Sequence, residues 1–137
     1  MNLFVDSSAF FAAAYQPDRH HGRAIAILRG RTDLVTTDHV LVESWLLLRH
    51  RAGRPAADRF WAALRGGAAT IEPVGLVDLE AAFAIGAAFP DQDFSIVDRT
   101  SFAVMERLGI HRVATFDDDF AIYRYGPRRD RAFEVLW

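Results

Sequence analysis

The sequence contains no cysteine and no lysine. Without cysteine, disulfides and thiolate metal sites are excluded, and a reducing compartment such as the cytoplasm is compatible with the composition. Without lysine, a Walker-type phosphate loop, Schiff-base catalysis and phospho-aspartate sites that depend on a lysine are excluded. No apolar run approaches the roughly 18 residues that span a membrane, and no basic stretch at the amino terminus indicates a signal peptide. We therefore expect a cytoplasmic protein that does not enter a membrane.

The chain has 137 residues, a hydrophobic content of 51% and a formal net charge of -2. This length predicts one domain over residues 1–137 with a real hydrophobic core. Apolar strand-like runs alternate with helical patterns, which predicts an α/β fold with a small, mainly parallel sheet. The expected strands are 3–5, 34–36, 69–74, 112–116 and 132–136, with Pro73 favouring an edge position for the third. The expected helices are 9–14, 23–29, 40–50, 56–64, 78–89 and 95–108.

A short apolar strand at 3–5 ends abruptly in Asp6 and two serines. Ser7 or Ser8 is suited to cap the helix that follows. In an open parallel sheet, ligands bind beyond the carboxyl ends of the strands. Asp117 follows the expected strand 112–116 in the same way as Asp6 follows the first strand. Both carboxylates are therefore expected at the edge where chemistry takes place.

Two further acids lie on apolar helix faces. Asp98 is followed at helical spacing by Phe102 and Met105, and Glu43 is flanked by apolar residues three and four positions away. An isolated buried carboxylate is costly unless it is paired or coordinated. The pattern suggests that Asp6, Glu43, Asp98 and Asp117 share one site.

Each acid also has a structural alternative. Ser95 and Asp98 fit a capping box, in which Asp98 reaches back to the Ser95 amide. Glu43 has the alternative of pairing with a buried Arg, and Asp117 that of capping a short helix that begins at Asp118. Asp6 is the hardest to explain structurally, because a strand-end acid before two serines has no obvious unsatisfied donor to meet.

Several carboxylates in one pocket need a counter-charge, because like charges a few Å apart cannot all ionise. A hard divalent cation supplies it, and an all-oxygen ligand set selects Mg²⁺ or Mn²⁺. Such an ion can activate water for an in-line displacement at a phosphoryl group. The spacing of the histidines does not predict a second metal site. The five histidines are His20, His21, His39, His50 and His111.

Four ordered motifs make the chain resemble the PIN-domain ribonucleases, and most closely the VapC-type toxins of bacterial toxin–antitoxin pairs. The resemblance covers essentially the full length. Its markers are Val-Asp-Ser-Ser at 5–8, Glu43, Ser-Ile-Val-Asp at 95–98 and Ala-Thr-Phe-Asp-Asp-Asp-Phe at 114–120.

The resemblance implies a three-layer α/β/α sandwich with an acidic site, Mg²⁺- or Mn²⁺-dependent RNA cleavage, homodimerisation and inhibition by a cognate antitoxin. It assigns the catalytic acids to Asp6, Glu43, Asp98 and Asp117. Metal binding falls to Asp6, Asp98 and Asp117, joined by Asp119, where some members carry a further acid. Orienting hydroxyls match Ser8 and Thr115, and more loosely Ser95.

An RNA substrate needs phosphate contacts. Candidates are Arg49, Arg51 and Arg54 after the third helix, and Arg124, Arg128, Arg129 and Arg131 near the end. A solvated or carboxylate-paired surface is the alternative for each group. Two other functions stay open: a housekeeping PIN nuclease without an antitoxin, and a non-catalytic interaction module whose acids form caps and ion pairs. A calorimetric titration with divalent cations separates the module from the nuclease.

Overall fold

A five-stranded, wholly parallel sheet forms the centre of the computed structural model, which describes residues 2–137. The strand order is β3-β2-β1-β4-β5. The strands are β1 (Leu3–Val5), β2 (Leu34–Thr37), β3 (Thr70–Glu72), β4 (Arg112–Ala114) and β5 (Glu134–Leu136). The first strand lies in the middle because all three of its residues are apolar and tolerate complete burial. The strand before Pro73 lies at one edge, as the sequence predicted.

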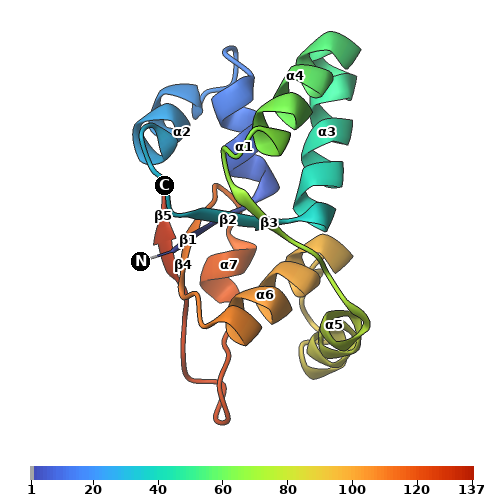
Figure 1. Cartoon of the computed structure of the whole chain (residues 1–137). Helices are drawn as coiled ribbons and strands as arrows, with labels where there is room; N and C mark the ends of the chain where they lie inside the picture. Colours follow the sequence, from blue (N-terminus) through green and yellow to red (C-terminus); the bar gives the residue numbers. More distant parts are fainter. Residues whose placement is uncertain (1) are drawn as a thin grey trace.

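Helices cover both faces of the sheet, as Figure 1 shows. One layer holds α1 (Ser7–Ala14), α2 (His21–Leu28), α3 (Asp38–Ala52) and α4 (Arg54–Arg65). The other holds α5 (Leu76–Ala88), α6 (Ile96–Leu108) and the short α7 (Asp119–Ile122). The predicted α/β/α sandwich is confirmed, and its sheet is parallel throughout the described residues.

An aromatic cluster fixes α6 and α7 against the sheet. The Phe102 ring stacks on Tyr123 with centroids 4.3 Å apart, and meets Phe120 edge-on at 4.9 Å. The Tyr123 hydroxyl donates a hydrogen bond to Glu106 on α6, at 2.7 Å. Because large buried rings contribute much of a core's stability, the start of α7 is held rigidly beside α6.

The start of α1 differs from the prediction. The helix begins at Ser7, so neither Ser7 nor Ser8 is its cap, and Asp6 takes the N-cap position without a side-chain capping bond. The two serine hydroxyls turn instead toward the carboxylates of Glu43 and Asp6. A carboxylate–hydroxyl pair inside the protein is stronger than an exposed cap, because it is shielded from water.

The third helix is not deeply buried, although its sequence is apolar almost all round. Val42 and Leu46 are 55% and 56% exposed on its outer face. Across residues 2–137, none of the helices combines the length and the apolar character needed to cross a membrane.

Candidate active site

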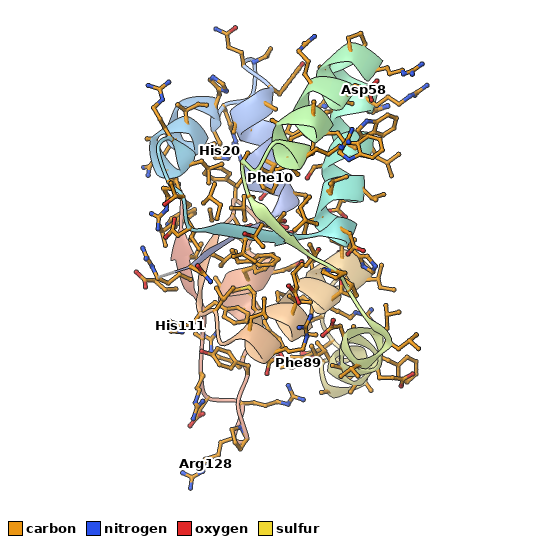
Figure 2. All side chains as sticks on the ribbon, in the orientation of Figure 1. Phe10, His20, Asp58, Phe89, His111 and Arg128 are labelled. Carbon is orange, nitrogen blue, oxygen red and sulfur yellow. The ribbon has the colours of Figure 1, made fainter. Side chains whose placement is uncertain are left out.

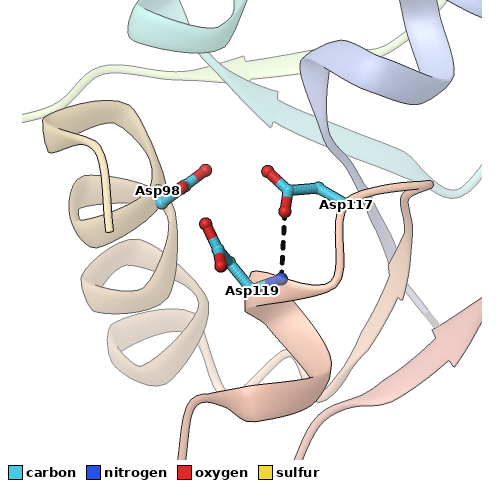
Figure 3. Close-up of side chains that lie close together, drawn as sticks. All are labelled: Asp98, Asp117 and Asp119. Atoms are coloured by element: carbon cyan, nitrogen blue, oxygen red, sulfur yellow. Dashed lines mark hydrogen bonds between the residues drawn. The ribbon is translucent and has the colours of Figure 1, made fainter. Parts of the chain in front are cut away.

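Three carboxylates converge where β4 leads into α7 and α6 begins. One oxygen from each of Asp98, Asp117 and Asp119 lies within 4.8 Å of the other two. Figure 3 shows Asp98 pointing from the first turn of α6 toward Asp117, in the loop after β4, and Asp119, at the start of α7. The Asp119 backbone N–H donates to Asp117 Oδ1 at 3.0 Å, which fixes that carboxylate and leaves its second oxygen free of this bond.

Asp6 stands beside this trio and is held by two hydroxyls. Its Oδ2 accepts hydrogen bonds from Ser8 Oγ at 3.0 Å and from Thr115 Oγ1 at 2.8 Å. Thr115 Oγ1 also accepts the Asp117 backbone N–H at 3.0 Å. These bonds tie the ends of β1 and β4 together, so that Asp6 and Asp117 hold fixed positions at one edge of the sheet.

Glu43 joins the site through a residue that the sequence reasoning did not select. Ser7 donates a short hydrogen bond to Glu43 Oε1, and its hydroxyl also lies 3.5 Å from Asp6 Oδ1. Ser7 therefore bridges the acid on α3 to the acid after β1. The position of Ser7 next to Asp6 was the available signal in the sequence. The sequence alone did not show which carboxylate the Ser7 hydroxyl contacts.

Asp98 forms the capping box and also faces the other acids. Its Oδ2 accepts the Ser95 backbone N–H at 3.2 Å, and its own N–H donates to Ser95 Oγ at 3.0 Å, which is a capping box. The same carboxylate faces Asp117 and Asp119. The cap therefore orients the acid rather than consuming it. The bond to the carboxylate comes from the Ser95 backbone N–H, whereas the Ser95 hydroxyl accepts the Asp98 amide, so its role as a supporting hydroxyl stays a prediction. Asp117 accepts the N–H of Asp119, the first residue of α7, but the N-cap of that helix is Asp118, so the predicted helix start at Asp118 is wrong by one residue.

The carboxylates repel one another and are poorly solvated. Burial raises the pKa of Asp98 to about 8, helped by its hydrogen bond with Asp119 and by the charges of Asp117 and Asp6. Burial raises the pKa of Asp6 to about 6, against the opposing effect of the Thr115 and Ser8 hydroxyls. Burial also raises the pKa of Asp119. Metal-free, the site therefore retains a proton on Asp98 at neutral pH.

The residues present fit a hard divalent cation. The donors are all carboxylate oxygens, which suit Mg²⁺ or Mn²⁺ rather than Zn²⁺. Burial, the hydrogen bond with Asp119 and the charges of Asp117 and Asp6 raise the pKa of Asp98, and a bound cation would favour its ionised form instead. Asp98, Asp117 and Asp119 are close enough to share one ion, and Asp6 lies within electrostatic reach of two of them.

We expect the metal-free protein to lose thermal stability as pH rises from about 4 to about 8. The pKa of folded Asp98 lies above its unfolded value of 3.8, so the folded state binds more protons in this window. Its contribution is complete below about pH 4 and is lost as pH rises through about 8. Melting temperatures in EDTA across this range provide the measurement, and Asp98→Asn should flatten the slope. A wild-type slope that the variant leaves unchanged contradicts the assignment.

The candidate RNA-binding arginines do not surround the acids. Arg49 and Arg51 lie in the last turn of α3, with Arg51 roughly 12 Å beyond Glu43 along the helix axis. Arg54 pairs with Asp58 at 3.2 Å on the surface. Arg124 donates to three backbone carbonyls at the end of α7. Their contact with RNA stays a prediction.

The other three arginines belong to the segment between α7 and β5, where Tyr125 and Arg131 form an antiparallel bridge. Figure 2 shows Arg128 at the tip of this projecting hairpin. The Arg129 guanidinium lies over the Phe89 ring, 5.1 Å from its centroid. The hairpin packs near the carboxyl end of α6, because Tyr125 and Arg131 line a hollow together with Gly109. It is therefore remote from Asp98 at the other end of that helix.

The fold and the carboxylate cluster together indicate a class of protein, and comparison with known sequence families identifies that class. The PIN domain family matches residues 3–124, and the chain belongs to this family.

A more particular likeness is to a "23S rRNA-specific endonuclease VapC20" from two strains of Mycobacterium tuberculosis. The chain is 35% identical to it over 120 residues, which are 87% of this chain and 92% of the relative. The crystal structure of M. tuberculosis VapC20, described as a sarcin-ricin loop cleaving toxin, superposes with a TM-score of 0.83 at 34% identity. That superposition covers 88% of this chain and 94% of the other.

Proposed function

We propose that this chain is a toxin of the VapC type, a metal-dependent endoribonuclease that hydrolyses a phosphodiester bond in RNA. The carboxylate cluster of Asp98, Asp117 and Asp119, beside Asp6, is the observation that supports it most directly. The likeness to an rRNA endonuclease over most of both chains supports RNA as the substrate. We take the sarcin-ricin loop of 23S rRNA as the first substrate to test.

In this reaction the side chains of the protein bind the metal ion and hold the carboxylates in position. Asp98, Asp117, Asp119 and Asp6 would hold a divalent ion, which would supply a water of lowered pKa and offset charge on the phosphoryl group. The Ser8 and Thr115 hydroxyls keep the Asp6 oxygens aimed at the cluster, and the Ser95 cap does so for Asp98. Glu43, held by Ser7, is placed to accept a proton or to order a water at the rim.

The direct test is cleavage of a synthetic RNA hairpin that carries the sarcin-ricin loop. The purified protein should cut it in Mg²⁺ or Mn²⁺, and sequencing the new 5′ ends should give one dominant site. A scrambled hairpin of equal length serves as the substrate control. Failure to cut the hairpin, ribosomal RNA or total RNA in either metal overturns the proposal.

We expect Thr115→Val to lower cleavage by roughly 10- to 100-fold, as loss of a residue that orients a metal ligand does. The substitution removes one bond to Asp6 and one to the Asp117 amide while it keeps the side-chain volume. Thr70→Val on the exposed edge strand β3 is the matched control and should cleave normally. The initial rate at several Mg²⁺ concentrations separates weakened metal binding from a lower maximal rate. If Thr115→Val cleaves as fast as Thr70→Val, the Thr115 hydroxyl does not orient a residue that cleavage requires.

We also propose that the protein forms a homodimer and binds a cognate antitoxin. The support is apolar surface that a monomer leaves in water: Val42 and Leu46 on α3, and Val77 and Phe83 on α5. Light scattering should give the mass of a dimer, and Leu46→Glu should shift it toward the monomer. A wild-type monomer at micromolar concentration contradicts the dimer.

The proposed substrate implies a cytoplasmic location, because ribosomes are its targets. We further propose that residues 1–137 form a single domain, since the chain's first and last strands lie in one sheet. A single calorimetric unfolding transition is the expected result, and two separated transitions contradict it.

A further inference from the structure

A second hollow opens at the same edge of the sheet as the acids. It has a volume of about 320 Å³ and is lined by His20, Arg23, Phe116 and Trp137. Its position follows from the register of the two last strands, in which Ala114 lies beside Leu136. Phe116 lies two residues beyond the end of β4 and Trp137 lies one residue beyond the end of β5, so both side chains emerge beyond the carboxyl edge.

Flat rings and one arginine line this hollow. The His20 imidazole stacks on the Phe116 ring with centroids 4.4 Å apart and planes 4° from parallel. The Trp137 side chain is 66% exposed. Arg23 donates through Nη1 to the Trp137 carbonyl at 2.8 Å, which places its guanidinium at the rim. Arg19 donates to His20 Nε2 at 3.1 Å and adds a second positive charge.

The hollow is joined to the acid cluster by a single peptide. Phe116 lies between Thr115, which holds Asp6, and Asp117, whose α-carbon is roughly 3.8 Å further along the chain. The Phe116 backbone N–H donates to Ser8 Oγ at 2.9 Å, and the same hydroxyl bonds Asp6. The aromatic wall is therefore held by the bonds that orient the acids. A ligand whose phosphate lies at the acids therefore has the group next to that phosphate beside the stacked rings of His20 and Phe116.

We propose that this hollow seats an unpaired nucleobase of the RNA substrate, from a nucleotide beside the scissile phosphate. The inference rests on the proposed function and names a contact that selects the cleavage site. Single-stranded RNA is bound by aromatic faces that stack on its bases and by cations that meet its backbone. The hollow offers both, and its volume lies at the small end of ligand pockets, about 300 to 1,000 Å³. A peptide gains less here, because parallel rings match a planar base better than a side chain with tetrahedral carbons.

The test is a steady-state comparison of Trp137→Ala with Trp61→Ala on the sarcin-ricin hairpin. Trp61 is 46% exposed on α4 and serves as the matched control. Trp137→Ala should raise KM by roughly 5- to 100-fold, the range for loss of one stacked base. Its kcat should stay close to that of the wild type, because Trp137 does not touch the acids. Trp61→Ala should change neither constant.

A binding measurement without catalysis separates the two proposals. In EDTA, titration with the hairpin should quench the tryptophan fluorescence of the wild type and of Trp61→Ala, and the quenching should be largely lost in Trp137→Ala. If the wild type cleaves RNA and Trp137→Ala keeps the wild-type KM, the nucleobase site is wrong and the nuclease stands. If quenching depends on Trp137 but no RNA is cut in any metal, the nuclease is wrong and the hollow still binds RNA. If Trp137→Ala weakens only the binding of the antitoxin, the hollow is a protein-docking site and the inference is overturned.

Discussion

Asp98→Asn is expected to lower RNA cleavage by at least about 100-fold, the upper end of the loss caused by changing a residue that only orients a metal ligand. The same substitution should raise the melting temperature of the metal-free protein by roughly 2–5 °C at pH 8. Activity falls because a carboxylate is removed from the cluster. Stability rises because the pKa of Asp98 is raised to about 8, so its ionised form is unfavourable in the folded state. The asparagine oxygen can still accept the Ser95 amide, so the helix cap survives.

Asp78 provides the matched control for this prediction. It is also a buried acid at the third position of a helix, and it also bonds back to the cap residue, through the Gly75 amide. Arg107 donates two hydrogen bonds to it and holds its pKa below the usual range. Asp78→Asn should therefore lower the melting temperature and leave cleavage unchanged. If Asp98→Asn lowers the melting temperature as Asp78→Asn does and leaves cleavage unchanged, Asp98 acts only as a helix cap.

Chelation of divalent ions should abolish cleavage, and Mg²⁺ or Mn²⁺ should restore it. Without an ion the acids are not all ionised at neutral pH, because burial, the hydrogen bond with Asp119 and the charges of Asp117 and Asp6 raise the pKa of Asp98 to about 8. A bound divalent ion would favour loss of the Asp98 proton and would offset the repulsion between the carboxylates. At a free metal concentration about 100 times Kd, mass action should raise the melting temperature by on the order of 5–10 °C. Calorimetric titration and thermal melts with and without EDTA provide the measurements.

Asp117→Asn and Asp58→Asn separate a site effect from a general effect of ions. Asp117 belongs to the cluster, whereas Asp58 is an acid on α4 that bonds Trp45 and Arg54. The metal-induced rise in melting temperature should disappear in Asp117→Asn and persist in Asp58→Asn. Undiminished cleavage in excess EDTA would show that the carboxylates hold no ion, and the proposed mechanism would then be wrong.

Much of the fold could be predicted from local pattern. The alternation of short apolar strands with helices predicted the α/β class, and Pro73 predicted an edge strand. The boundary at Ser7 could not be predicted, because both serines are good caps in isolation. Their hydroxyls instead bond Glu43 and Asp6, and Glu43 lies 36 residues away from Ser7. Local preference yielded to a contact that exists only after the sheet and α3 have come together.

The candidate site shows the same division. Asp6 and Asp117 were recognisable because each follows an apolar strand, and Asp98 because it shares an apolar helix face. Asp119 entered only through the family resemblance, since three consecutive aspartates give no clue about which of them points inward. The structure turns Asp117 and Asp119 toward Asp98, while Asp118 remains exposed.

The sequence by itself determined the fold class, the absence of thiol and lysine chemistry, and the acids that end strands or face inward. Only the tertiary structure decided which acids share a cluster, that Ser7 links Glu43 to Asp6, and that a hollow of His20, Phe116 and Trp137 opens beside them. The physical reason is that periodicity and capping act over a few residues along the chain. The distances between carboxylates depend on how β1, β4, α3 and α6 are packed, and that packing is set by the whole core.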